Sequence, residues 1–349
     1  MDTSTLPTFA SPDVLKDVRF SLLDLVAVRE GGTVAQALAI ALDTARHVES
    51  LGYTRYWMAE HHNMEGIASS STAVMVGHVA GGTSTIRVGS GGIMLPNHAP
   101  LQVAEAFGTL AELYPGRIDL GLGRAPGTDP HTMRALRRDR TESVDDFPAD
   151  VAELQHLLAP ARPGQRLIAT PGAGTEVPIW LLGSSLFSAQ LAAEKGLPYA
   201  FASHFAPRYL LQAIEMYRAR FKPSATLAKP YVAIGVPVIA APTDEEAELL
   251  ASSTYKRVLG ILTGQRGKLG APVPGFLQDL SPQERAGIAD FLALAVVGGP
   301  ETVRAGLSSI VEQTGVDELV FVSDVFDPEL RKRSLTIAAQ AIQTEAVAA

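Results

Sequence analysis

Short apolar stretches of strand type alternate with longer amphipathic or alanine-rich stretches along most of the chain. The apolar stretches predict strands, which cover residues 18–28, 53–59, 86–94, 118–122, 179–182, 199–202, 231–239 and 318–322. The stretches between them predict helices at residues 33–51, 70–80, 100–113, 144–158, 185–195 and 328–344. Eight strands separated mostly by helices predict a (β/α)8 TIM barrel of the α/β class. An open doubly wound sheet is the alternative, because alternation alone does not show that the sheet closes.

Residues 241–300 separate the last two predicted strands, and this connection is far longer than the usual ~2–6 residues. Its middle part, residues 263–275, is rich in glycine and proline and carries two cations. We expect one barrel domain over residues 1–349, with a polar tail at 1–17. We expect the 241–300 insertion, between strands 7 and 8, to act as a mobile lid over the carboxyl ends of the strands. An ordinary surface loop is the alternative.

Composition narrows the class of protein. A content of 46% hydrophobic and 19% charged residues is typical of a globular protein with a large core. The absence of cysteine excludes disulfides, thiolate metal sites and a cysteine nucleophile, and it fits a reducing cytoplasm. A net charge of −8 argues against a nucleic-acid groove, and the one basic cluster, at residues 134–140, is read as a solvated helix face.

The first residues show no leader pattern, and no apolar run approaches the ~18 residues of a membrane span. We therefore expect a soluble cytoplasmic protein without membrane contact.

Glu60, His61 and His62 directly follow the second predicted strand. Side chains alternate along an extended chain, so we expect the two histidines to point to different faces, one of them into a pocket. A histidine titrates near neutrality and can move protons. A satisfied structural histidine is the alternative, and the position at a strand end favours a catalytic role.

Metal binding is the competing explanation for the many histidines. His78, His98 and His131 add to the pair at 61–62, and Asp129 is also present. However, the first strand is not followed by the His-x-His of barrel hydrolases, and no His-Glu-x-x-His occurs. We therefore expect no metal, and a metal-dependent barrel hydrolase remains the alternative.

Glycines interrupt the third predicted strand at residues 89–92. Glycine inside a strand indicates a bulge or the close approach of the backbone to something flat, and tight packing of strand against helix is the alternative. Arg124 follows the fourth strand and can pair with a phosphate. The surrounding residues 121–127 match the dinucleotide fingerprint poorly, since the third glycine is one place late and Pro126 interrupts the helix start.

A serine cluster lies between the fifth predicted strand and its helix. Ser184, Ser185 and Ser188 bring three hydroxyls to the start of that helix, where backbone N–H groups are also free. This combination predicts a phosphate cradle. Simple capping of the helix by one serine is the alternative.

Together these segments resemble the bacterial luciferase-like flavin monooxygenases, a family of (β/α)8 barrels. The resemblance is strongest at residues 59–62 (Ala-Glu-His-His), 89–96 (Gly-Ser-Gly-Gly-Ile-Met-Leu-Pro) and 114–124 (Tyr-Pro-Gly-Arg-Ile-Asp-Leu-Gly-Leu-Gly-Arg). It runs from about residue 18 to residue 221 and continues more loosely afterwards. The chain is most similar to the single-chain oxidoreductase branch of that family.

The resemblance implies roles for individual residues. His61 takes the position of the catalytic histidine near the reactive edge of the flavin, with Glu60 beside it in the cofactor site. Gly91 and Gly92 match the pair that forms a non-prolyl cis peptide facing the flavin ring. Arg124 matches the arginine near the flavin phosphate. The three serines at 184, 185 and 188 fall on the phosphate-binding stretch.

The resemblance also implies an activity and partners. We expect reduced FMN and O2 as reactants, a small and largely apolar organic substrate, a separate NAD(P)H:flavin reductase, and a homodimer formed through helices beside the second and third strands. An F420-dependent hydride-transfer enzyme and a flavin-binding protein without turnover remain alternatives. Gly123 stands where the light-producing subunit has a reactive cysteine, so the resemblance gives no reason to expect bioluminescence.

Overall fold

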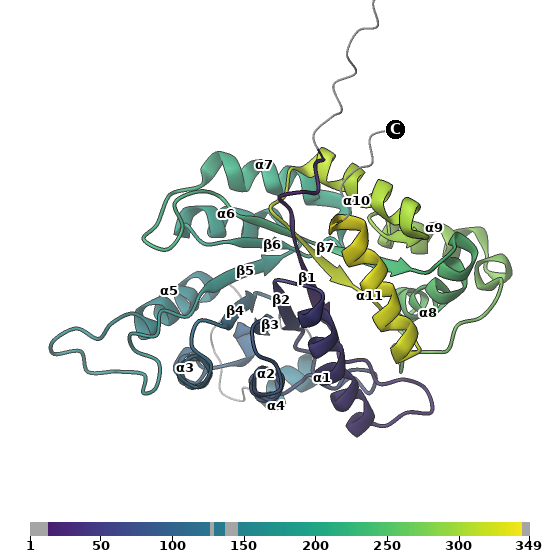
Figure 1. Cartoon of the computed structure of the whole chain (residues 1–349). Coiled ribbons are helices and arrows are strands. Elements are labelled where there is room, and N and C mark those ends of the chain that lie inside the picture. The colour runs from purple at the N-terminus through teal and green to yellow at the C-terminus, as the bar shows by residue number, and fades with distance from the viewer. Residues whose placement is uncertain (1–12, 126–128, 137–145, 344–349) are drawn as a thin grey trace, which may run out of the picture.

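Eight parallel strands close into a barrel in the computed structural model of the chain, which describes residues 13–125, 129–136 and 146–343 (Figure 1). The barrel strands are β1 (Arg19–Asp24), β2 (Arg55–Met58), β3 (Arg87–Met94), β4 (Ile118–Gly123), β5 (Ile179–Gly183), β6 (Tyr199–Phe201), β7 (Val232–Ala240) and β9 (Glu318–Val322). Each pairs in parallel with its neighbours in the order β6-β5-β4-β3-β2-β1-β9-β7, and the pairing of β6 with β7 closes the ring. The predicted TIM barrel is confirmed, and the open sheet is excluded.

The first strand is shorter than the apolar run that predicts it. β1 ends at Asp24, whose Oδ1 accepts a hydrogen bond of 2.8 Å from the backbone N–H of Val26. Val26 has a positive φ of 49°, which no strand residue adopts. The chain therefore turns at this point, and Val28 bonds instead to the carbonyl of Gly66.

Helices cover the outside of the barrel. They are α1 (Val34–Ser50), α2 (Thr72–Gly81), α3 (Pro100–Leu113), α4 (Pro130–Leu136), α5 (Phe147–Leu158), α6 (Leu186–Lys195), α7 (Leu210–Arg220), α8 (Asp244–Leu262), α9 (Pro282–Phe291), α10 (Pro300–Thr314) and α11 (Pro328–Gln343). The capping box of Thr33 and Gln36 starts α1, and Gly196 in the left-handed conformation ends α6. α11 packs against α1, so the first and the last helix of the described chain lie side by side (Figure 1).

The 241–300 insertion is mostly regular structure. It contains α8, a short 3-10 helix (Phe276–Asp279), α9 and the strand β8 (Val296–Gly298). β8 pairs only with the last three residues of β7, from Val238 to Ala240, so it extends the sheet outside the barrel. α8 and α9 lie together on one side of the barrel (Figure 1). The sequence analysis assigned no helix or strand within the insertion, and in the structure only its middle part is irregular.

A buried ionic network fills the barrel at the amino ends of the strands. Arg55 bonds to Asp119 at 2.8 Å and to Glu318 at 2.8 and 3.0 Å. Burial lowers the pKa of Arg55, but the charges of Glu318 and Asp119 outweigh it and hold this pKa above its ordinary value. Trp57 and Trp180 form the next layer, with ring centres 5.0 Å apart. The interior is therefore solid up to the carboxyl half of the strands.

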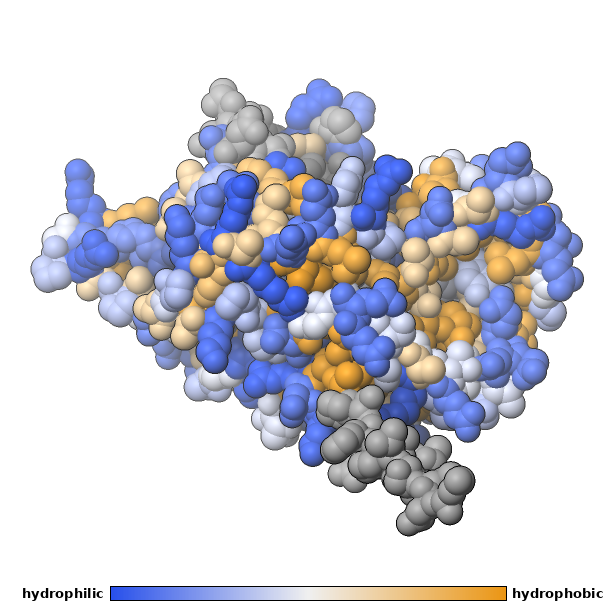
Figure 2. Space-filling model, turned by 90° about the horizontal axis from the view of Figure 1, so that it is seen from above, coloured by the Kyte–Doolittle hydropathy of each residue, from blue (hydrophilic) through white to orange (hydrophobic). Residues whose placement is uncertain are grey.

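The outer core lies between the strands and the helices, where β-branched and aromatic side chains from both are buried. On the face shown in Figure 2, hydrophilic side chains cover most of the surface and apolar ones gather near its centre. Among the described residues, no helix combines the length and the apolar character that crossing a membrane requires.

Candidate active site

A cavity of about 1690 Å³ lies over the carboxyl ends of the barrel strands. All eight barrel strands, or the residues that follow them directly, contribute to its wall, from Leu23 of β1 to Val322 of β9. In TIM barrels this is the end at which active sites are assembled. His61 and Arg124, the histidine and the arginine singled out from the sequence, both line this one cavity.

His61 and His62 both line the cavity. We expected the two side chains to point to different faces, one of them into a pocket, and this remains a prediction. β2 ends at Met58, before both histidines, so the chain is no longer extended there. His62 also bonds to Glu60, whereas His61 lies close enough to His204 for its charge to lower the pKa of that residue.

Glu60 lies behind the cavity wall. Its side chain is buried, and Oε1 accepts hydrogen bonds from Nε2 of His62 at 2.9 Å and from Nε2 of His98 at 2.8 Å. Burial raises the pKa of Glu60, but the bonds and charges of His98 and His62 outweigh it and hold this pKa below its usual range. Glu60 is not part of the cavity wall. Glu60 therefore lies behind His62 and His98 and orients both rings, and its expected place beside a cofactor remains a prediction.

Glu60, His62 and His98 also form the one group of described residues whose donor atoms cluster as metal ligands do, within 4.8 Å of one another. A carboxylate oxygen only accepts hydrogen bonds, so each histidine must carry its proton on Nε2. These direct bonds make the cluster a hydrogen-bonded support behind the cavity wall.

Gly91 and Gly92 of β3 form the floor of part of the cavity. The peptide bond between them is cis, as the resemblance implies, and the pairing of β3 with β4 shifts its register at this point. A Cβ on Gly91 would lie 2.6 Å from Leu23, and one on Gly92 would lie 2.6 Å from the carbonyl of Gly121. The crowding is between strands, not between strand and helix. The pair offers bare backbone to the cavity because no side chain fits.

Arg124 directly follows β4, and its side chain lies against the first turn of α6. Its guanidinium stacks on the ring of Phe187, with 4.3 Å between its central carbon and the ring centre. Residues 183–185, which lead into α6, and Ser188 line the same cavity. The structure therefore brings together Arg124 and the serine cluster, which are about 60 residues apart in the sequence.

The three serines differ in what their hydroxyls do. Ser188 is buried and donates to the carbonyl of Ser185 at 2.9 Å, and Gly183 leaves it the room to do so. Ser185 is the N-cap residue of α6, but its side chain makes no capping hydrogen bond. Capping by one serine, the alternative reading, therefore does not occur, and the first N–H groups of α6 have no side-chain acceptor.

The insertion supplies one side of the cavity. Arg257 of α8 pairs with Asp324, which follows β9, at 2.7 Å, and both line the cavity. The irregular part of the insertion packs on the loop after β1, where Leu269 exchanges backbone bonds of 2.9 Å with Val28 and Glu30. Residues 265–268 thereby lie at the edge of the cavity.

His204, which the sequence reasoning missed, also lines the cavity. It follows β6 and packs over Gly235 of β7, and its Nδ1 is buried without a hydrogen-bond partner among the described residues. Burial, followed by the charges of His61 and Arg257, lowers the pKa of His204 to about 4. The available signal was its position directly after the sixth predicted strand, the same kind of position that singled out His61.

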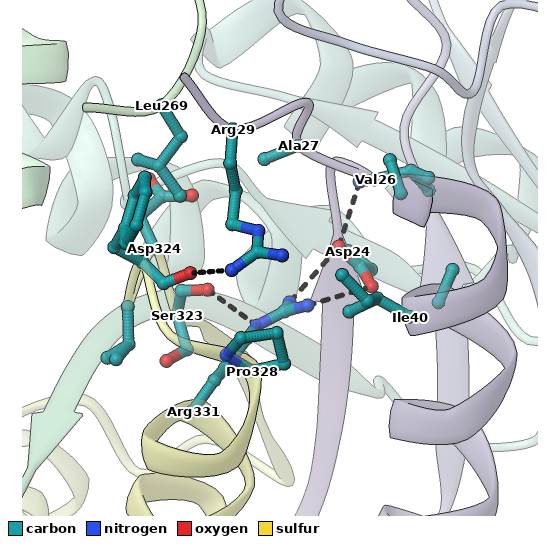
Figure 3. A pocket seen from close by; sticks show the side chains of 14 residues that line it. Asp24, Val26, Ala27, Arg29, Ile40, Leu269, Ser323, Asp324, Pro328 and Arg331 are labelled. Carbon is teal, nitrogen blue, oxygen red and sulfur yellow. Dashed lines mark hydrogen bonds and ion pairs between the residues drawn. The ribbon is translucent and has the colours of Figure 1, made fainter. Parts of the chain in front are cut away.

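A second hollow of about 20 Å³ lies between β1, α1 and the residues after β9 (Figure 3). Asp24 pairs there with Arg331 at 3.0 Å, and Arg331 also donates to the carbonyl of Ser323 at 2.9 Å. Burial raises the pKa of Asp24, but Arg331, Tyr56 and Val26 hold it below its usual range. The hollow has room for about one water molecule. The ion pair of Arg331 with Asp24 joins α11 to the barrel, and the hollow beside it is too small for a substrate.

Some of the positions discussed from the sequence lie outside the described residues. These are Pro126 and Gly127 of the glycine-rich motif, residues 137–140 of the basic cluster, and residues 1–12 of the tail. Arg134, at the start of the basic cluster, is exposed on α4.

Comparisons with known proteins agree with this geometry. A family model described as luciferase-like monooxygenase matches residues 18–318. A "Luciferase-like monooxygenase" of Escherichia coli (strain K12) is 49% identical over 93% of this chain and 96% of its own. The crystal structure of apo-MsnO8 is 34% identical, with a TM-score of 0.83 over 93% of this chain and 98% of that chain. The FMN complex of the oxygenating constituent of 3,6-diketocamphane monooxygenase from Pseudomonas putida shares the fold, with a TM-score of 0.71, 19% identity, and coverage of 93% and 97%.

Proposed function

The chain belongs to the luciferase-like monooxygenase family, and from that premise we propose that its cavity binds reduced FMN and uses it with O2 to oxidise a small, largely apolar organic substrate. The observation that carries the proposal is the single cavity that extends from His61 to Arg124. Its volume of about 1690 Å³ exceeds the ~300–1,000 Å³ of an ordinary ligand pocket, which leaves room for a cofactor and a substrate together.

The phosphate end of FMN fits the start of α6. A phosphate dianion needs positive charge and several N–H or O–H donors. Arg124 supplies the charge, and Ser184, Ser185 and the first N–H groups of α6 supply the donors. Ser188 contributes through its position in the first turn, since its hydroxyl already bonds to Ser185.

The ring end of FMN fits the floor formed by Gly91 and Gly92. Bare backbone admits a flat ring at close range, and the crowding around both Cβ positions keeps any side chain out. Trp57 and Leu23 surround this floor with apolar surface. When bound here, reduced flavin supplies the electrons with which O2 is activated.

His61 is the proton donor or acceptor of this site. It lies on the cavity wall, backed by His62, which Glu60 and its bonds hold in place. A histidine in such a position can exchange a proton with a reacting group inside the cavity.

The irregular part of the insertion acts as a lid in this proposal. Its backbone bonds from Leu269 to Val28 and Glu30 hold residues 265–268 at the cavity edge. Opening requires that these bonds and the close packing of Gly267 on Gly66 be broken, while Val273 and Ala271 keep the segment bonded to Ser252 and Lys256 of α8. Limited proteolysis within residues 263–275 should slow when FMN is bound, and equal cleavage with and without FMN would count against a lid.

Two partners complete the proposal. A separate NAD(P)H:flavin reductase supplies the reduced FMN. A second copy of the chain covers α2 and α3, where the apolar side chains of Val74 and Leu113 are 71% and 62% exposed. A monomer in solution at micromolar concentration would contradict the second point.

The test of the function is titration of the purified protein with reduced FMN and, separately, with reduced F420, followed by exposure to air. We expect binding of reduced FMN and a change in its oxidation rate. Binding of F420 alone would replace the proposal by F420-dependent hydride transfer. Binding of FMN with no effect on its oxidation would indicate a flavin-holding protein, and activity that follows bound metal would indicate a hydrolase.

A further inference from the structure

His204 stands out among the polar side chains of the cavity because one of its ring nitrogens is buried against the barrel wall without a partner. A Cβ on Gly235 would overlap with Nδ1 of His204, and the other nearest ring atoms, Cγ and Cε1, lie farther away, at 3.0 and 3.2 Å. Nδ1 therefore faces the backbone of Gly235. No hydrogen-bond partner for it exists among the described residues.

This contact determines where the ring carries its proton. The Cα hydrogen of Gly235 that occupies the Cβ direction points at Nδ1, so a proton on Nδ1 would collide with it. A buried N–H without an acceptor would also cost free energy. The neutral ring must therefore carry its proton on Nε2, which lies on the side of the ring away from Gly235.

The surroundings also keep the ring neutral. Burial, followed by the charges of His61 and Arg257, lowers the pKa of His204 to about 4, so the ring is uncharged at neutral pH. A neutral histidine with its proton on Nε2 is a hydrogen-bond donor of fixed direction.

We propose that His204 is a ligand-recognition residue whose Nε2–H donates a hydrogen bond to a carbonyl oxygen of the molecule bound in the cavity. A carbonyl oxygen is an acceptor without charge, which suits a neutral donor among apolar walls. The carbonyl belongs either to the organic substrate, which would then be a ketone, aldehyde, ester or amide, or to the flavin ring. The assignment of the carbonyl to a substrate or to the flavin rests on the proposed function. The assignment of Nε2–H of His204 as the donor does not.

The first experiment reads the proton directly. In the apo protein labelled with ¹⁵N-histidine, the His204→Leu variant identifies the signals of His204. We expect the tautomer with the proton on Nε2 at pH 7, with the ring still neutral at pH 5. A proton on Nδ1, or a charged ring at pH 7, would overturn the proposal.

The second experiment measures recognition with an isosteric pair of probes, 2-octanone and 2-methyl-1-octene, which differ by C=O against C=CH2. We expect the wild type to bind the ketone about 10-fold more tightly, the share of one hydrogen bond. His204→Leu should abolish this preference, and His204→Gln, which keeps a donor near the position of Nε2, should restore part of it. Gly235→Ala, which displaces the ring, should act as His204→Leu does. His156→Leu, at an exposed histidine of α5 away from the cavity, is the matched control and should change nothing.

Titration with FMN then distinguishes the two sources. Loss of the ketone preference in His204→Leu with unchanged FMN affinity assigns the bond to the substrate. An unchanged ketone preference with weakened FMN affinity assigns it to the flavin ring. Equal binding of ketone and alkene by the wild type, with the same FMN affinity in wild type and His204→Leu, would overturn the proposal. A wild type that binds neither FMN nor F420 would end the proposed function and leave the tautomer and ketone results standing.

Discussion

The guanidinium of Arg124 lies 4.3 Å from the ring centre of Phe187, which joins the end of β4 to the first turn of α6. A cation held over an aromatic face keeps its edge free to bond with an anion. Phe187 is 38% exposed, so the pair lies at the rim of the cavity and not in the core. The stacking therefore holds a positive charge beside the first turn of α6, where the backbone N–H groups have no side-chain cap.

Replacement of His61 should affect turnover more than binding. In His61→Ala the affinity for reduced FMN should stay roughly constant, while turnover should fall by about 10²–10⁴, the usual share of general acid–base help. Affinity is read by titration and turnover by the rate of reduced-flavin oxidation with substrate. His156→Ala, at an exposed histidine of α5, is the control. Unchanged turnover in His61→Ala would remove this residue from the mechanism.

Removal of Arg55 should destabilise the barrel strongly. Arg55→Leu leaves the carboxylates of Asp119 and Glu318 buried without this partner, and loss of one member of a buried ion pair costs about 3–5 kcal/mol. Urea unfolding measures the loss. The double variant Arg55→Leu/Glu318→Leu should be less destabilised than the sum of the two single variants. A cost for Arg55→Leu below about 1 kcal/mol would show that the network contributes little.

Acid should destabilise the fold through His204. Its pKa is about 4 in the folded protein, against an ordinary value of about 6.5 in the unfolded chain. Between these values the unfolded state binds more protons, so the free energy of unfolding falls as the pH falls. The contribution is fully present above about pH 6.5, and up to roughly 3 kcal/mol is lost by pH 4.

The check is urea unfolding of wild type and His204→Leu at several pH values between 4 and 7. His204→Leu lacks the titrating group, so its stability should depend less on pH in this range. The carboxylates whose pKa is held down, Asp24 among them, lose their contribution at lower pH and are common to both proteins. The same pH dependence in both proteins would contradict the low pKa of His204.

The alternation of apolar runs with helical stretches, together with the residues that start and end helices, was enough to predict the barrel. Each barrel strand overlaps one of the short apolar runs, and signals such as Thr33 with Gln36 and Gly196 marked the ends of helices. The error at β1 has a local cause, because the apolar run continues past Asp24 while the side chain of Asp24 turns the backbone at Val26. An apolar run cannot show where such a side-chain bond interrupts it.

The two helices of the insertion, α8 and α9, were not predicted, although the sequence carries the signals for the start of each. Thr243 followed by acids in the first turn starts α8, and Ser281 with Glu284 forms a capping box at α9. A third miss, β8, is three residues long and depends on pairing with β7, which no local pattern reveals.

The site residues that could be predicted are those that lie in or directly after a predicted strand. His61, Gly91, Gly92, Arg124 and the serines do line one cavity. The bond of Glu60 to His98 could not be predicted, because the two residues are 38 positions apart and only the fold brings them together. His204 was missed for the same reason, since its significance depends on Gly235 of the neighbouring strand.

The most direct test of the account compares FMN with riboflavin, which lacks the phosphate, in three proteins. The wild type should bind FMN roughly 10–100-fold more tightly than riboflavin, as a charge-assisted contact of about 1.5–3 kcal/mol requires. Arg124→Ala should lose most of this preference through weaker FMN binding, with riboflavin affinity unchanged. Arg166→Ala, at an exposed arginine outside the cavity, should behave as the wild type. An Arg124→Ala variant that keeps the full preference for FMN would contradict the account.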